Sequence, residues 1–360
     1  MDDLQLNYAC KTLARGLHNY FYEILFVSGN KQQKEGKMKY IVAACQPEVK
    51  QNDKAGNLAN VLSMIDEAAS IGAKVTVFPE YFLTWPPFKG MTAEQIDEFS
   101  ETIPGPSINA IAEKCKETGT YCVAGTIIEK CEDGKLRNTC AIIDDKGEII
   151  GKYSKVQPEN APAKHEPGIG IWPGNELPVF DTPLGRWAVM IDMDYTNLEI
   201  PRIYGLKGAD VLFGPTCWSS KFLKDIPGLA ESSSVQSLAY CVLVNPVGWR
   251  MDVPVHAWAF AAGDNANSID LSYSGGTAIA FDGVNIAQTT IMHQDIAYAV
   301  IDSEAPQESR NNDASIYPFW RRPDLYGEIL APETAQPWGT NVDHSDVPTQ
   351  IEPQWDKFKK

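Results

Sequence analysis

The chain has 360 residues, 44% of them hydrophobic, and carries a formal net charge of −16. The hydrophobic content is ordinary for a globular protein with a buried core, and the length suffices for one large domain or two smaller ones. The acidic balance excludes a general nucleic-acid binder, which needs a basic surface to neutralise phosphates, and a polybasic membrane anchor.

The eight cysteines show neither a CxxC pair nor a zinc-binding spacing. Several lie in apolar, strand-like runs such as "IVAACQP", where a free Cys behaves as a small hydrophobic residue. We therefore expect buried free thiols in a reducing, cytoplasmic compartment. No apolar run reaches the length of a membrane-spanning helix, so no contact with a membrane is expected.

The first 37 residues end in the polar stretch "KQQKEGK" and are expected to form an extension outside the core fold. After them, short apolar runs alternate with segments whose apolar residues recur at helical spacing. In this half we predict strands at 39–45, 74–80 and 121–129, a hairpin over 138–153, and helices at 57–72 and 107–119.

The second half repeats the pattern, and both halves contain a unit of helix, Gly-Ala and strand: "SIGAKVTVFPE" and "LKGADVLFGPT". This repetition indicates internal pseudo-symmetry. Here we predict strands at 187–192, 210–216, 241–248, 275–284 and 296–302, and helices at 197–209 and 229–240. Such alternation predicts an α/β fold with a sheet-on-sheet core, whose outer sheet faces are covered by helices.

Polar residues at the ends of these strands are candidate functional groups, because sites of α/β folds gather there. Glu80 ends the strand 74–80 and precedes several aromatic residues, a setting that suits a general base. Lys155 ends a hairpin strand, with Glu166 in the loop after it, and a positioned lysine can stabilise an oxyanion. The structural alternative for each is a solvated strand-end side chain.

A third strand end lies in "VMIDMDYTNLEIPR", where Asp192 stands on a strand–helix turn that has no Ser or Cys nucleophile. Backbone N–H groups at the start of the following helix can bind a negative charge. The alternative is helix N-capping by Asp194 or Asn197, which explains one aspartate more easily than two.

Taken together, these stretches resemble the nitrilase superfamily of carbon–nitrogen hydrolases over residues 39–305. The resemblance is carried, in order, by "AACQPEVKQNDKAGNLANV", "GAKVTVFPEYF", "GKYSKVQP", "EIPRIYGLKGADVLFGPT" and "RRPDLYG". It implies a four-layer α-β-β-α sandwich of the nitrilase type over residues 38–305. The extension 1–37 would precede this domain, and a tail, 306–360, would pack on the domain or on a partner subunit.

The resemblance also implies a catalytic site of Glu80, Lys155 and a cysteine, with Glu166 as a second, supporting glutamate. In this family a thiolate attacks an amide or nitrile carbon, and water hydrolyses the acyl-enzyme without a metal or a cofactor. Members commonly dimerise across the helix after the nucleophile, so a homodimer or a larger homo-oligomer is expected.

At the cysteine position this sequence has Asp192, and Ser233 and Gln236 stand where the family usually has an Arg and a Glu. A carboxylate lacks sulfur's nucleophilicity, and its attack gives an anhydride. Four explanations stay open: a change that disables a working hydrolase, a pseudoenzyme kept for binding or assembly, altered chemistry with Asp192 as base or nucleophile, or a thiol supplied by Cys217. The intact glutamate and lysine favour the first.

The two residues after the cysteine position, Met193 and Asp194, resemble the x-D form of amidases and carbamoyl-amide hydrolases rather than the Trp-Glu of nitrile-cleaving members. We therefore expect a small amide or N-carbamoyl substrate in preference to a nitrile. The side chains predicted to contact it are Tyr81, Trp85, Met193, Cys217 and Trp218. For the two tryptophans, packing between loops is an equal alternative.

Overall fold

The computed structural model describes residues 38–87, 91–161, 164–249, 272–311 and 321–326. The predicted extension, residues 1–37, and most of the predicted tail lie outside these ranges, so the proposed domain boundaries stay predictions. Within the described ranges, no helix is long and apolar enough to cross a membrane.

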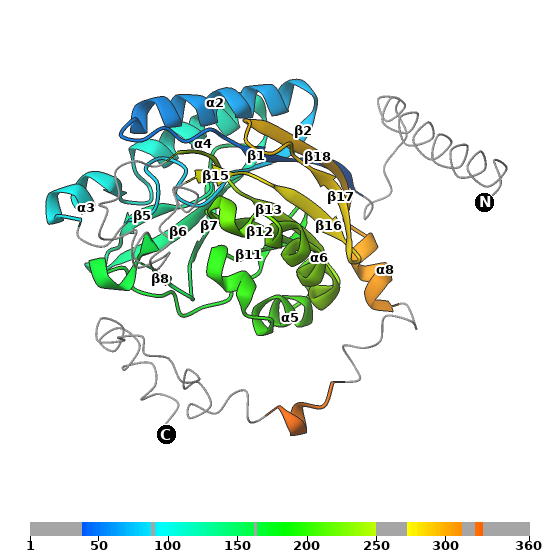
Figure 1. Cartoon of the computed structure of the whole chain (residues 1–360). Helices are drawn as coiled ribbons and strands as arrows, with labels where there is room; N and C mark the ends of the chain where they lie inside the picture. Colours follow the sequence, from blue (N-terminus) through cyan, green and yellow to red (C-terminus); the bar gives the residue numbers. More distant parts are fainter. Residues whose placement is uncertain (1–37, 88–90, 162–163, 250–271, 312–320, 327–360) are drawn as a thin grey trace, which may run out of the picture. The chain divides into compact units, whose positions relative to one another are not determined.

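The first sheet has eight strands in the order β18-β1-β2-β4-β6-β5-β3, with β7 paired to β6. Its strands are β1 (Lys39–Gln46), β2 (Ala73–Val77), β3 (Ser100–Glu101), β4 (Tyr121–Val123), β5 (Ile127–Lys130), β6 (Leu136–Ile143), β7 (Ile149–Ser154) and β18 (Asp295–Asp302). Helices α2 (Lys54–Ser70) and α4 (Pro106–Thr118) cover its outer face through an apolar cluster that contains Ile65, Ile111 and Cys122 (Figure 1).

The second sheet has six strands in the order β10-β11-β12-β13-β16-β17. They are β10 (Phe180–Thr182), β11 (Gly185–Val189), β12 (Val211–Pro215), β13 (Tyr240–Val244), β16 (Ala278–Phe281) and β17 (Val284–Gln288). Helices α5 (Glu199–Leu206) and α6 (Asp225–Ser237) cover its outer face, with Ile200, Tyr204 and Ala230 in the shared apolar cluster.

The inner faces of the two sheets form one core. Trp187 of the second sheet is fully buried, and its ring meets Tyr121 of the first sheet edge-on, with ring centroids 5.5 Å apart. The same cluster joins Val42 and Val77 to Phe213 across the sheets. The order of layers is therefore helix, sheet, sheet, helix, and the predicted sandwich is confirmed.

Shorter elements connect these layers. They are α3 (Ala93–Phe99), β8 (Asn160–Ala161), β9 (Lys164–His165), β14 (Val247–Trp249), β15 (Ser272–Ser274), α8 (Ala305–Asn311), and the 3-10 turns η1 (Pro167–Ile169), η2 (Asp192–Thr196), η3 (Ser220–Phe222) and η7 (Pro323–Leu325). Helix α3 was not predicted because none of its residues is buried, so apolar periodicity gives no signal. The predicted strand 241–248 was wrong in its extent, since it divides at Pro246, which cannot donate a ladder hydrogen bond.

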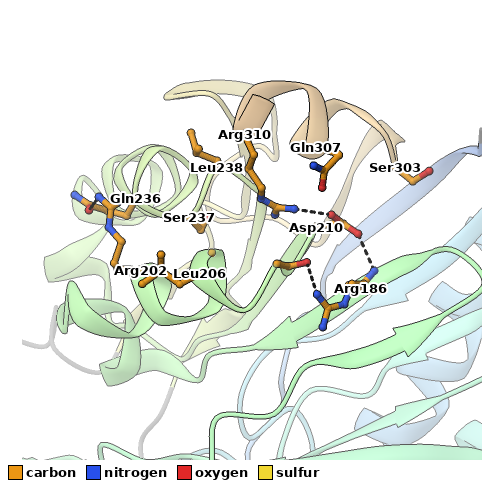
Figure 2. Close-up of a pocket in the computed structure, with 12 residues that line it drawn as sticks. Arg186, Arg202, Leu206, Asp210, Gln236, Ser237, Leu238, Ser303, Gln307 and Arg310 are labelled. Atoms are coloured by element: carbon orange, nitrogen blue, oxygen red, sulfur yellow. Dashed lines mark hydrogen bonds and ion pairs between the residues drawn. The ribbon is translucent and has the colours of Figure 1, made fainter. Parts of the chain in front are cut away.

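A cavity of about 380 Å³ lies where the C-terminal ends of α5 and α6 approach α8 (Figure 2). Arg186 donates to the carbonyl of Lys207, and Arg310 donates to that of Ala209, just past the end of α5. Between these arginines, Asp210 accepts from the Arg310 guanidinium at 3.2 Å and from the Arg186 backbone N–H at 2.9 Å. The two arginines thus satisfy backbone carbonyls of the segment that follows α5.

Candidate active site

Four buried ionisable side chains converge at the ends of strands from both sheets. Glu80 is the third residue after β2, Lys155 directly follows β7, and Asp192 is the third residue after β11. Glu166 lies in the loop between β9 and η1. Each of the four is at most 1% exposed. The structure thus brings together all four residues that were predicted as the catalytic group.

The Lys155 ammonium is the centre of this cluster. Its Nζ lies 3.0 Å from Glu80 Oε1, 2.9 Å from Glu166 Oε2 and 3.2 Å from Asp192 Oδ2. An ammonium has three donor hydrogens, which matches three carboxyl partners. One positive charge does not balance three carboxylates away from water, so burial of this cluster is costly.

Glu166 is held by further donors. Its Oε1 accepts from the Tyr81 hydroxyl at 2.5 Å, and its Oε2 accepts from the Glu159 N–H at 2.6 Å. Burial, followed by the charges of Glu166 and Glu80, raises the pKa of the Tyr81 hydroxyl well above its usual value, so Tyr81 remains a donor. Several donors around one carboxylate stabilise its ionised form. Tyr81, predicted to contact substrate, therefore supports Glu166 in the structure.

Asp192 occupies a strained turn. Its φ of 48° lies in the left-handed region, which a non-glycine residue adopts at an energetic cost that functional sites often retain. Its Oδ1 accepts from the backbone N–H of Cys217 at 3.3 Å, while its Oδ2 faces Lys155. Two donors from different parts of the chain thus converge on one negative group, an arrangement that can also stabilise an oxyanion.

Asp194 ties this turn to the chain on either side of Lys155. Its Oδ2 accepts from the Ile191 N–H at 2.8 Å and from the Tyr153 hydroxyl at 2.7 Å, and its Oδ1 accepts from the Gln157 N–H at 3.0 Å. Burial raises the pKa of Asp194 to about 6. These contacts fix the turn that carries Asp192 relative to the strand end that carries Lys155.

Neither Asp194 nor Asn197 caps helix α5, although the Asp194 carboxylate accepts the Ile191 N–H at the start of the 3-10 turn η2, as in a capping box. Helix α5 begins after Leu198, which makes no side-chain cap bond. Asp194 instead accepts the N–H of Ile191, which precedes it, and the Asn197 side chain donates to the Met193 carbonyl at 3.1 Å. The 3-10 turn η2 lies between the strand and the helix, so α5 begins at Glu199, two residues later than the predicted helix 197–209.

The remaining predicted pocket residues pack close to this turn or between loops. Trp85 is fully buried against Tyr273, with ring centroids 4.4 Å apart, and Cys217 joins the same apolar cluster. Trp218 meets Phe222 edge-on at 5.8 Å. Both tryptophans therefore pack as the structural alternative predicts, and their contact with substrate stays a prediction. Met193 is half-buried on the turn itself.

The two other departures from the family pattern lie on α6. Ser233 is buried, and Gln236 accepts from Arg202 of α5 at 2.5 Å. Gln236 thus joins the two outer helices of the second sheet.

Sequence reasoning missed two residues of the site, Asn138 and Tyr153. Asn138 on β6 donates to Glu80 and to Glu166, and Tyr153 on β7 donates to Asp194. The only signal for Asn138 was a polar side chain at the start of the apolar run "NTCAII". In the described part of the chain, no group of three or more His, Cys, Asp or Glu residues has the arrangement of a metal site.

Comparisons with known proteins agree with this geometry. A family model described as carbon-nitrogen hydrolase matches residues 41–311. The chain is 30% identical to nitrilase homolog 2 of Dictyostelium discoideum over 281 residues. The aligned region covers 76% of this chain and 78% of that protein. The chain is also 30% identical to omega-amidase NIT2 of Homo sapiens over 226 residues. This aligned region covers 57% of this chain and 77% of the human protein.

Solved structures show a similar fold. The carbon-nitrogen hydrolase from Helicobacter pylori G27 matches with a TM-score of 0.70 at 18% identity, over 82% of this chain and 99% of that one. Saccharomyces cerevisiae Nit3, a member of branch 10 of the nitrilase superfamily, matches with a TM-score of 0.62 at 22% identity, over 78% and 96% of the two chains. At these identities the likeness concerns the fold.

Asp194→Asn is expected to flatten the dependence of stability on pH. Since the pKa of Asp194 rises from 3.8 to about 6 on folding, its contribution to stability is present below pH 3.8 and is lost as the pH rises through 6. The rise corresponds to about 3 kcal/mol. Urea denaturation at several pH values between 4 and 7.5 measures the slope for each protein.

The matched control is Asp181→Asn, whose carboxylate is 81% exposed and whose removal should leave the slope unchanged. Equal slopes for Asp194→Asn and the unaltered chain would contradict the shifted titration of Asp194.

Proposed function

The chain belongs to the carbon–nitrogen hydrolase family, and from this premise we propose that its site is built for small amides or N-carbamoyl compounds and is disabled by Asp192 at the nucleophile position. One observation carries the proposal: the buried cluster of Glu80, Lys155 and Glu166 is complete, whereas a carboxylate stands on the adjoining strand–helix turn. The activity in the name of the human omega-amidase and the Met193-Asp194 pattern support an amide rather than a nitrile.

With a thiol at position 192, the cluster has a role for each group. Glu80 takes the thiol proton, and the thiolate attacks the carbonyl carbon. The oxygen of the tetrahedral intermediate is stabilised by the two donors that now contact Asp192, the Lys155 ammonium and the Cys217 N–H. The C–N bond then breaks, the amine leaves with the proton from Glu80, and water hydrolyses the thioester and restores the thiol.

Asp192 fails at the step in which the C–N bond should break. If its carboxylate attacked an amide, the intermediate would expel the carboxylate again, because a carboxylate leaves more easily than an amine. The ion pair with Lys155, at 3.2 Å, lowers its nucleophilicity further. We therefore expect the chain to bind an amide without hydrolysing it.

The structure gives less support to a thiol supplied by Cys217. Its side chain belongs to an apolar cluster with Val49, Trp85 and Tyr273. Its backbone N–H is the group that contacts the Asp192 carboxylate. This placement favours Cys217 as a donor and Asp192 as the residue in the nucleophile position.

Asp192→Cys is expected to release ammonia from at least one member of a panel of small primary amides, an ω-amide, N-carbamoyl compounds and nitriles. The rate should exceed that of the unaltered chain by at least about 100-fold, because thiolate acylation becomes possible. A coupled ammonia assay measures the release. The variant Asp192→Cys with Glu80→Gln is the control for the general base and should be inactive.

Three outcomes would contradict the proposal. An inert Asp192→Cys variant across the whole panel rules out a disabled hydrolase. Turnover by the unaltered chain that Asp192→Asn abolishes assigns the chemistry to the carboxylate. Turnover by the unaltered chain that Cys217→Ser abolishes assigns it to a displaced thiol.

We also infer a homodimer formed across α5 and α6, which would equally serve a binding or assembly role without turnover. Leu198 and Leu206 are 55% and 50% exposed on the α5 side, and Val235 on α6 is 39% exposed. Helices α5 and α6 are neighbours (Figure 1). Large apolar side chains that are exposed on neighbouring helices mark association surfaces. The cysteines of the described residues are free thiols, which supports a cytoplasmic location.

Leu206→Glu combined with Val235→Glu is expected to convert the dimer to a monomer, because two buried charges per subunit would oppose association. Light scattering coupled to size-exclusion chromatography measures the mass. Val284→Glu, at a side chain that is 59% exposed on β17, is the control and should keep the dimer. A monomeric unaltered chain, or a dimer that the double variant leaves intact, would contradict the inference.

A further inference from the structure

Asn138 lies between the two glutamates of the cluster. Its Nδ2 donates to Glu80 Oε1 and to Glu166 Oε1, each at 2.7 Å. Its backbone carbonyl accepts from the Lys155 N–H at 2.9 Å. One residue on β6 thus contacts three of the four members of the cluster, from a strand that carries none of them.

The other end of the Asn138 amide shows that this placement has a cost. Its Oδ1 is buried and accepts no hydrogen bond from the described residues. A buried acceptor without a donor lowers stability. The orientation of the amide is nevertheless determined, because two carboxylates can only face the NH₂ end.

Two other buried asparagines satisfy both ends of their amides. Asn57 accepts from the Lys50 N–H and donates to the carbonyls of Lys50 and Leu83. Asn245 accepts from the Trp218 N–H and donates to the Trp218 carbonyl. These two asparagines are bonded at both ends, whereas Asn138 directs its NH₂ group at two carboxylates and its Oδ1 accepts from none of the described residues.

Electrostatics explains what this NH₂ group does. Glu80 and Glu166 repel each other when both are ionised, and Lys155 bridges them through Glu80 Oε1 and Glu166 Oε2. Asn138 adds a second bridge through the Oε1 atoms without adding charge. Without this bridge, the repulsion would turn the Glu80 carboxylate away from the place where it takes a proton.

We propose that Asn138 is a positioning residue, which holds the general base Glu80 beside Glu166 so that proton transfer at position 192 is possible. The inference rests on the proposed function for its chemical step. This positioning role requires, at position 138, an uncharged side chain that donates hydrogen bonds to both glutamates. Leucine retains the volume without a donor, aspartate retains the shape but presents oxygens to two carboxylates, and serine cannot bridge both glutamates.

The test is made in the Asp192→Cys background, with Asn138→Leu, Asn138→Asp and Asn138→Ser added singly. Two quantities are measured: the rate at which iodoacetamide alkylates the introduced thiol, with the unaltered chain as background, and kcat and KM for the best amide. We expect alkylation to slow by about tenfold, since the thiol loses its base. We expect kcat to fall by about 100-fold, with KM changed by less than about threefold.

Asn285→Leu in the same background is the matched control. Like Asn138, Asn285 has an Oδ1 that accepts no hydrogen bond from the described residues. Its Nδ2 donates to a single glutamate, Glu231, at 2.9 Å. It should leave alkylation and kcat unchanged while lowering the melting temperature about as much as Asn138→Leu. If Asn138→Leu does not fold, the smaller Asn138→Ser takes its place.

The outcomes separate this inference from the proposed function. If folded Asn138 variants are alkylated at the rate of their parent, the positioning role is overturned, whether or not the parent hydrolyses amides. If the parent is inert on every amide but the Asn138 variants slow its alkylation, the proposed function fails and the positioning role stands. Loss of kcat in the Asn285 control equal to that in the Asn138 variants would also overturn the role.

Discussion

A buried lysine ammonium among three carboxyl groups is the interaction on which this site depends. Glu80 and Lys155 follow strands of the first sheet, whereas Asp192 follows a strand of the second. Lys155 contacts Glu80 at 3.0 Å within the first sheet, whereas its 3.2 Å contact with Asp192 forms only when the two sheets pack face to face. Burial of these charges is costly unless each has a partner, so the site depends on the sandwich to bring the partners together.

The side chain at position 192 sets the charge of the site. A neutral thiol at this position would leave one ammonium facing two carboxylates, whereas aspartate adds a third carboxyl group beside Lys155. The turn has a left-handed φ at Asp192 and is linked through Asp194 to Gln157, on the far side of Lys155. A protein without need of a nucleophile at this point has no evident reason to retain such strain, which is why we interpret the turn as that of a hydrolase with its nucleophile replaced.

Much of this arrangement could be predicted from the sequence, for physical reasons. Buried strands and helices such as β2 and α2 carry apolar periodicity, and Glu80, Lys155 and Asp192 stand where that periodicity ends. Helix α3 has no buried face and gives no such signal. The bridging role of Asn138 was not predictable, because Asn138 lies within β6 rather than at a strand end, and the run "NTCAII" does not indicate which carboxylates its side chain contacts.

The central claim is that position 192 is the place of the attacking atom, and the most direct measurement is to locate a covalent adduct. The Asp192→Cys variant and the unaltered chain would be treated with chloroacetamide, a small amide that alkylates a thiolate held at its site, and then digested for peptide mapping by mass spectrometry. The account predicts one dominant adduct, on the peptide that contains residue 192, in the variant only. Modification of Cys217 in both proteins, with none at residue 192, would contradict it.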